Sequence, residues 1–422
     1  MELELTPGEL AALRWIACNG EEVSSRRAHL LLMRDASRPV REICYKGGLS
    51  RGQAYYWLRS FQEKRLGAFP APVLEAAQAE QARVAPSIGD GPDRKSPAVR
   101  WDDSMSTAGR KVLRFHFQHM LSHEPGTRQG AHIEELHDMR VATRRMRSAF
   151  RVFAPYFSPA VFRPLLKGLR RTGRVLGRVR DLDVFMEKAQ LYLESLPEGE
   201  REHLGPLTED WRERREVAHT RMLDHLDSKR YRRFVKDFRR FLTAEGEGES
   251  PHFSTPSEAQ GALSVHQVVP GLIIERHDVV LGYDPLIGDA SLETLHGLRV
   301  DCKRLRYTLE FFVDILGSEA KDAIKEVVRL QDHLGDLNDA DVASRMLIGF
   351  LDQWSKLDRR DGIDTRGVAS YLLTRLDELH TLYAAFPSRW RRFNRPASQQ
   401  LLAAIVSDLS AAASQETSVA QA

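Results

Sequence analysis

Two stretches of the chain, 136–150 and 295–309, carry a histidine followed by basic residues at the spacing of one helix face. The first basic row is His137, Arg140, Arg144, Arg147 and Arg151, and the second is His296, Arg299, Lys303 and Arg306. At about 100° per residue, each row covers one side of a helix and apolar residues cover the neighbouring side. Arginine forks meet phosphate oxygens two at a time, and a rise of about 1.5 Å per residue lets them follow successive phosphates. The pattern therefore predicts a site for a phosphate-rich polyanion.

The two basic rows belong to an internal repeat. LHDMRVATRRMRSAF at 136–150 matches LHGLRVDCKRLRYTL at 295–309 with an offset of 159 residues. LGRVRDLDV at 176–184 matches LGDLNDADV at 334–342 with an offset of 158. Two matches at nearly the same shift indicate a duplicated helical unit. Further candidate cations, beside the rows or on the next helix of each copy, are Arg145, Lys167, Arg171, Arg174, Arg304, Lys325 and Arg329. Arg145 and Arg304 fall off the rows, roughly opposite the expected core.

Local charge distinguishes this pattern from an ordinary solvated helix face, which is the main alternative. From His137 to Arg180, eleven arginines and one lysine stand against a single acid, although the whole chain has a net charge of +3. Solvated faces usually mix signs because like charges one turn apart repel. For each histidine of the rows, the alternative is a packing residue that hydrogen-bonds a backbone carbonyl.

The rest of the sequence predicts an all-α protein that contains neither a membrane helix nor a cofactor. Of its 422 residues, 42% are hydrophobic and 29% charged, and no apolar run approaches the ~18 residues of a membrane span. Three scattered cysteines and no apolar signal segment point to the cytoplasm. No metal-site, hydrolase or nucleotide-loop motif is found, so we expect a non-enzymatic protein. The acids Asp181, Asp183, Asp339 and Asp341 are interpreted as helix caps and as partners that orient arginines.

Breaks in composition divide the chain into parts. The predicted parts are a helical domain at 1–70, a linker at 71–102 with one short helix at 73–84, a helical region at 103–412 and a tail at 413–422. The acidic loop 244–258 separates the helical region into halves at 103–243 and 259–412.

The first domain contains a candidate helix-turn-helix. A short apolar helix with Val40, Ile43 and Cys44 precedes a Gly-Gly turn, and Ser50 is the expected N-cap of a second helix. This segment resembles the helix-turn-helix of transposase-type DNA-binding domains. Its candidate DNA-binding residues are Arg51, Gln53, Tyr55 and Arg59.

The repeated motifs resemble those of a known family. LHDMRVATRRMRSAF and LHGLRVDCKRLRYTLEFF resemble the histidine-containing signature of the CHAD domain (conserved histidine alpha-helical domain), and the LGRVRDLDVF and LGDLNDADV segments resemble its second motif. The resemblance covers about 103–412. It implies two helical bundles related by a pseudo-twofold axis, with the basic residues named above around a central groove. It also implies binding of inorganic polyphosphate and association with polyphosphate granules.

The second copy departs from the family pattern, and two other functions stay open. Asn338-Asp339 replaces the usual Arg-Asp, and residues 296–338 carry seven cations against eight acids. We therefore expect the second half to bind more weakly or to be partly shielded. One alternative function is a DNA-binding regulator whose helical region senses phosphate polyanions. The other is an enzyme that acts on polyphosphate, because arginine clamps also stabilise phosphoryl transfer.

Overall fold

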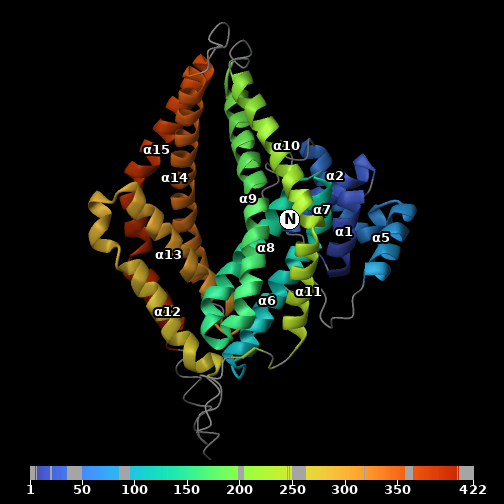
Figure 1. Ribbon diagram of the computed structural model, residues 1–422, viewed down its shortest axis with the longest axis vertical. Helices are drawn as coiled ribbons and strands as arrows, with labels where there is room; N and C mark the ends of the chain where they lie inside the picture. Colours follow the sequence, from blue (N-terminus) through green and yellow to red (C-terminus); the bar gives the residue numbers. More distant parts are fainter. Residues whose placement is uncertain are drawn as a thin grey trace, which may run out of the picture. The chain divides into compact units, whose positions relative to one another are not determined.

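The chain is folded into helices that form two compact units. The computed structural model describes residues 5, 7–19, 21–35, 50–84, 96–130, 132–197, 204–244, 246, 248–249, 263–317, 319–356, 365–405 and 407. Within these residues the fold is all-α, as predicted, and its only β-structure is two isolated bridges (Figure 1). The units are Met1–Lys95 with Gln118–Met139, and Ser96–Phe117 with Arg140–Ala422.

The first unit is a small helical domain with its own apolar core. Its described helices are α1 (Pro7–Asn19), α2 (Glu22–Asp35), α4 (Arg51–Lys64), the short 3-10 helix η1 (Arg65–Ala68), α5 (Ala71–Val84) and α7 (Glu124–Gln129). Leu13, Leu30, Phe61 and Ala77 are fully buried in this core. Because Ala77 lies on α5, the first part of the predicted linker 71–102 packs as part of this domain.

The second helix of the predicted helix-turn-helix is α4, and Ser50 is its N-cap as expected. The backbone N–H of Gln53 donates to Ser50 Oγ at 3.2 Å, and the backbone N–H of Ser50 donates to Gln53 Oε1 at 2.9 Å. This reciprocal pair is a capping box, which satisfies two free donors at the helix start. The expected first helix, with Val40, Ile43 and Cys44, lies outside the described residues, so the helix-turn-helix stays a prediction.

Residues 118–139 also belong to the first unit, although the sequence places them in the helical region that starts at 103. Gln129 Nε2 donates to Asn19 Oδ1 at 3.2 Å. His132 Nε2 lies 3.2 Å from the carbonyl oxygen of Ala17. The compact unit therefore does not end at residue 70, because the α7 segment also packs against α1.

The second unit repeats one helical pattern. Its main helices are α6 (Met105–Ser122), α8 (Ile133–Phe153), α9 (Pro159–Ser195), α10 (Gly205–Asp227), α11 (Lys229–Thr243), α12 (Val265–Leu281), α13 (Leu292–Phe311), α14 (Ala320–Ser355) and α15 (Arg366–Phe393), of which α6 and α8 begin or end in the first unit. In each copy a basic-row helix is followed by a very long one, α9 with 37 residues and α14 with 36. Figure 1 shows α10 running beside α9, and α15 beside α14.

Reciprocal hydrogen bonds join the two copies where each begins. The backbone N–H of Met105 donates to Leu263 O, and that of Val265 donates to Asp103 O, both at 2.9 Å. Each bond maps onto the other when 160 residues are added or subtracted, which is nearly the repeat offset. The pair is therefore what a pseudo-twofold relation between the halves requires.

An apolar cluster joins the far ends of the long helices. It buries Leu207 and Trp211 of α10 against Leu347 of α14 and Tyr371 of α15. Burying each such side chain contributes about 1.5–3 kcal/mol. The halves are thus held together both where they start and near the tips of the long helices.

Candidate functional site

The apolar faces of α8 and α13 set the direction of the two basic rows. Met139 and Met146 of α8 and Leu298 and Leu305 of α13 are fully buried. Beside these faces, six basic-row residues occupy half-buried positions, namely Arg140, Arg144, Arg147, Arg299, Lys303 and Arg306. The helical period of the sequence thus predicts how each helix is rotated about its own axis, and so which way its basic row points.

The two rows meet around Lys303. Its ammonium group interacts electrostatically with two arginines of α13 and two of α8, which are Arg299, Arg306, Arg144 and Arg140. Burial, followed by these four positive neighbours, lowers the pKa of Lys303 from 10.5 to about 7. Cations from both halves therefore share one site that is short of negative charge.

Carboxylates of the second repeated motif lie beside this site. Arg140 Nη2 donates to Asp181 Oδ1 at 2.9 Å, and Asp339 attracts Arg299. Burial raises the pKa of Asp181, and the negative charge of Asp339 adds to the rise against the opposing effect of Arg140. Lys188 of α9 lies 3.8 Å from Asp339 of α14. Over the described part of the chain, no group of three or more His, Cys, Asp and Glu side chains could hold a metal ion.

The two row histidines have different surroundings. His296 is exposed, and its Nδ1 lies 2.9 Å from Asn338 Oδ1. Asn338, which departs from the family pattern, is thus the partner of this histidine, and no hydrogen bond from its ring to a backbone carbonyl is found among the described residues. His137 is half-buried on α8 and belongs to the first compact unit.

A second group of cations continues along α8 and α9. Arg147 interacts with Arg151 on its own helix and with Arg170 and Arg174 on α9. Burial lowers the pKa values of Arg147 and Arg151, and neighbouring positive charges lower them further. Arg174 is thus placed beside the first row. Arg170 was not among the candidates, although it lies one turn before Arg174 on the same helix face.

Arg145 contacts the other half, which corrects its expected position opposite the core, whereas Arg304 is exposed and pairs with Asp301 of its own helix. Arg145 Nη2 lies 3.2 Å from Glu310 Oε2 on α13. Arg304 interacts electrostatically with Arg151 on α8. With the offset of 159 these contacts are equivalent, because 145 matches 304 and 151 matches 310. At equivalent positions, Arg145 therefore attracts Glu310, whereas Arg304 repels Arg151.

Glu310 also gives the second row its own counter-charge. Arg306 Nε donates to Glu310 Oε1 at 2.6 Å. Although burial acts to lower it, the pKa of Arg306 is raised, chiefly through the charge of Glu310 and this hydrogen bond. The equivalent residue of the first row, Arg147, has Arg151 at the corresponding position. This difference supports the expectation that the second half is partly shielded.

The four candidates predicted to support the rows from the following helices lie elsewhere. Lys325 and Arg329 are exposed on α14 and pair with acids of their own helix, the former with Asp322 at 2.7 Å. Lys167 and Arg171 line a pocket between α9 and α11. The α9 cations that interact with the first row are instead Arg170 and Arg174, which act on Arg147, and Arg180, which acts on Arg140.

The candidate DNA-binding residues on α4 are partly engaged with their own helix. Gln53 completes the capping box, and Arg59 Nε donates to Glu63 Oε1 at 3.0 Å. Tyr55 and its neighbour Tyr56 are 50% and 65% exposed. The side chain of Arg51 lies outside the described residues.

Comparisons with known proteins identify the helical region. The family model of the CHAD domain matches residues 111–348. The crystal structure of the CHAD domain from the plant Ricinus communis aligns with 24% identity and a TM-score of 0.52, covering 68% of this chain and 94% of that one. PptA from Streptomyces chartreusis aligns with 14% identity and a TM-score of 0.52, covering 68% and 100%. A search of curated proteins found no match.

The family match leaves residues 1–110 outside, so it gives no support to the helix-turn-helix. Of the helices described, none has the length and apolar character needed to span a bilayer.

Proposed function

Because the chain belongs to the CHAD domain family, we propose that it binds inorganic polyphosphate along the facing basic rows of α8 and α13, without acting on it as an enzyme. The observation that carries this proposal is the position of Lys303 among four arginines drawn from both halves. A chain of phosphates would supply the negative charge that this site is short of.

The extent of the cationic surface favours a linear polyanion over a single phosphate. From Arg140 to Arg151, α8 covers about 16 Å at a rise of about 1.5 Å per residue. Arg170 and Arg174 add cations from α9 beside this path. When several cations neutralise successive phosphates, counterions are released and the affinity falls steeply with salt concentration.

The test is titration of long-chain polyphosphate into the full-length protein over a series of salt concentrations. Replacing Arg144 and Arg299 by Gln removes one cation of each row at positions that form no ion pair with an acid among the described residues. We expect affinity to fall by more than about tenfold at 0.15 M salt, and the slope of log K against log salt to fall by about 1.4 for two lost contacts.

The matched control is Lys325→Gln with Arg329→Gln. It removes the same charge from exposed positions on α14 that pair with local acids. The control should bind polyphosphate within about twofold of the unchanged protein, because exposed ion pairs contribute little. Equal losses in the two double variants would mean that net charge, rather than the facing rows, governs binding.

Two further measurements complete the proposal. Incubation with polyphosphate and Mg²⁺, followed by gel analysis of chain length, should leave the length unchanged; shortening or extension would show an enzyme. In cells, a fluorescently labelled protein should gather at polyphosphate granules, and the Arg144→Gln, Arg299→Gln variant should not.

A second candidate function, DNA binding by the first unit, is favoured by one observation. Tyr55 and Tyr56 are largely exposed on α4 beside Arg59. The full chain is required for the test, because residues 118–139 belong to the same compact unit. A gel shift with duplex DNA should be lost on replacing both tyrosines by Ala while polyphosphate binding persists. If the gel shift is lost instead in the Arg144→Gln, Arg299→Gln variant, DNA binds at the proposed polyphosphate site and not on α4.

A further inference from the structure

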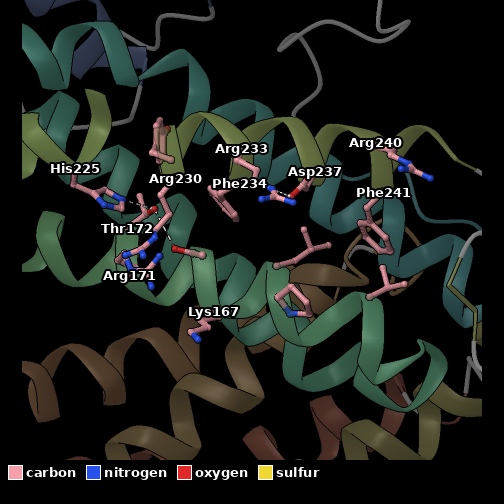
Figure 2. A pocket seen from close by; sticks show the side chains of 15 residues that line it. Lys167, Arg171, Thr172, His225, Arg230, Arg233, Phe234, Asp237, Arg240 and Phe241 are labelled. Carbon is pink, nitrogen blue, oxygen red and sulfur yellow. Dashed lines mark hydrogen bonds and ion pairs between the residues drawn. The ribbon is translucent and has the colours of Figure 1, made fainter. Parts of the chain in front are cut away.

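A separate pocket lies between α9 and α11, with a volume of about 450 Å³. Figure 2 shows side chains of both helices around it. The two helices approach closely because residue 168 is glycine: a Cβ there would lie 2.3 Å from Cδ2 of Phe234. The ring of Phe234 thus packs directly on the backbone of α9 and forms part of the pocket wall.

One end of the pocket is positively charged. Arg171 of α9 and Arg230 of α11 both interact electrostatically with His225, at the end of α10. Burial, and then these two guanidinium groups, lower the pKa of His225. Thr172 Oγ1 lies 3.1 Å from Nε2 of His225 and holds the ring in place. In Figure 2 these four side chains gather at one end of the pocket.

The carboxylate of the pocket does not neutralise this end. Asp237 lies farther along α11 and is 3.8 Å from Arg233 Nε. Figure 2 shows this pair away from Arg171 and His225. Among the described residues, no ion pair joins Arg171 or Arg230 to an acid. The converging cations are therefore available to an anion.

The remainder of the wall combines an apolar surface with the charged side chains Lys167, Arg233, Asp237 and Arg240. The apolar surface is formed by Leu165 and Pro164 of α9 and by Phe234 and Phe241 of α11. An inorganic phosphate chain has no surface that would replace water on such a wall. A ligand with an anionic end and an apolar body would use both parts of the pocket, and small-molecule sites commonly have volumes of about 300–1,000 Å³.

We propose that this pocket binds a small organic phosphate, with the phosphate between Arg171, Arg230 and His225 and an apolar body against Phe234. The site is separate from the basic rows and does not depend on their binding polyphosphate.

The test uses 1-naphthyl phosphate as the probe, measured by isothermal titration calorimetry on the full chain. Inorganic phosphate supplies the anion without the apolar body, and 1-naphthol supplies the body without the anion. The probe should bind at least tenfold more tightly than either control compound. If its affinity only equals that of inorganic phosphate, the pocket is not the proposed site.

Matched variants locate the binding. Arg171→Gln with Arg230→Gln should weaken probe binding by more than tenfold, whereas Arg178→Gln with Arg232→Gln, on the same two helices and exposed, should leave it unchanged. The Arg144→Gln, Arg299→Gln variant should also keep full probe binding, even if the proposed polyphosphate function fails. Displacement of the probe by long-chain polyphosphate, or equal losses in both matched pairs, would overturn the proposal.

Discussion

The unusual protonation of Lys303 gives the sharpest prediction for the basic rows. In the free protein, burial and four arginines hold the pKa of this lysine at about 7. Phosphate oxygens beside the ammonium group would favour its charged form and return the pKa towards 10.5. Polyphosphate binding above pH 7 should therefore take up a proton.

The sign and size of the effect follow from linkage. The bound form holds more protons than the free form between the two pKa values, so affinity falls as pH rises through this window. The loss approaches tenfold per pH unit, and a full return of the pKa to 10.5 would make binding at pH 9 about 50-fold weaker than at pH 7. Below pH 6 the contribution of Lys303 should be constant, because the lysine is charged in both forms.

The assay is calorimetric titration of long-chain polyphosphate at constant ionic strength from pH 6 to pH 9. Lys303→Arg keeps the charge at every pH, so its profile records all other titrating groups, including those of polyphosphate itself. Repeating the titration in buffers of different ionisation enthalpy measures proton uptake directly. The reasoning fails if unchanged protein and Lys303→Arg give parallel pH profiles and no proton is taken up at pH 8.5.

Four further predictions concern stability and shielding. Replacing Lys303 by Met should raise the melting temperature at pH 6.5, and the gain should shrink by pH 9, because the stability cost of the lowered pKa is complete below about pH 7 and declines as pH rises towards 10.5. Gly168→Ala should destabilise the protein by about 1–3 kcal/mol in urea unfolding, because its Cβ would overlap Phe234. Gly335→Ala, where nothing lies within 4 Å of the added Cβ, should instead stabilise it by about 0.5–1 kcal/mol. Glu310→Gln should tighten polyphosphate binding several-fold in the salt-series titration, because it frees two arginines; weaker or unchanged binding would show that this carboxylate does not shield the site.

The rotation of α8 could be read from the sequence because one apolar face controls it. Met139 and Met146 fall on the buried side, and this leaves only one direction for Arg140 and Arg144. The same reasoning applies to α13. Periodicity is informative for such helices because each packs through a single continuous stripe.

The orientation of α9 could not be read in the same way. This helix has packing partners on several sides: Gly168 meets Phe234 of α11, while Arg170 and Arg174 approach Arg147 of α8. Matching residues between the repeats selected Lys167 and Arg171, which line the pocket instead. A helix with neighbours around it has no single face from which the position of its polar residues can be derived.

The contact of Arg145 with Glu310 was likewise beyond the sequence. These residues are 165 positions apart, and only the pseudo-twofold relation between the halves brings them together. Once that relation is known, the pairing is expected at the equivalent positions, where Arg304 acts electrostatically on Arg151. The repeat offset alone does not say which residues of one copy touch which residues of the other.

Duplication itself accounts for both the site and its asymmetry. When a helix with a cationic face is copied about a twofold axis and the two faces meet near the axis, like charges must come together, as they do around Lys303. The repulsion has to be offset by apolar packing elsewhere, or by an anion bound between the faces. Glu310 relieves part of it from within the chain, at the position where the first copy keeps Arg151. If further acids of the chain removed all of this repulsion, an external anion would gain little by binding there. The first half lacks the carboxylate of Glu310, so a polyphosphate chain should bind most tightly to the first half.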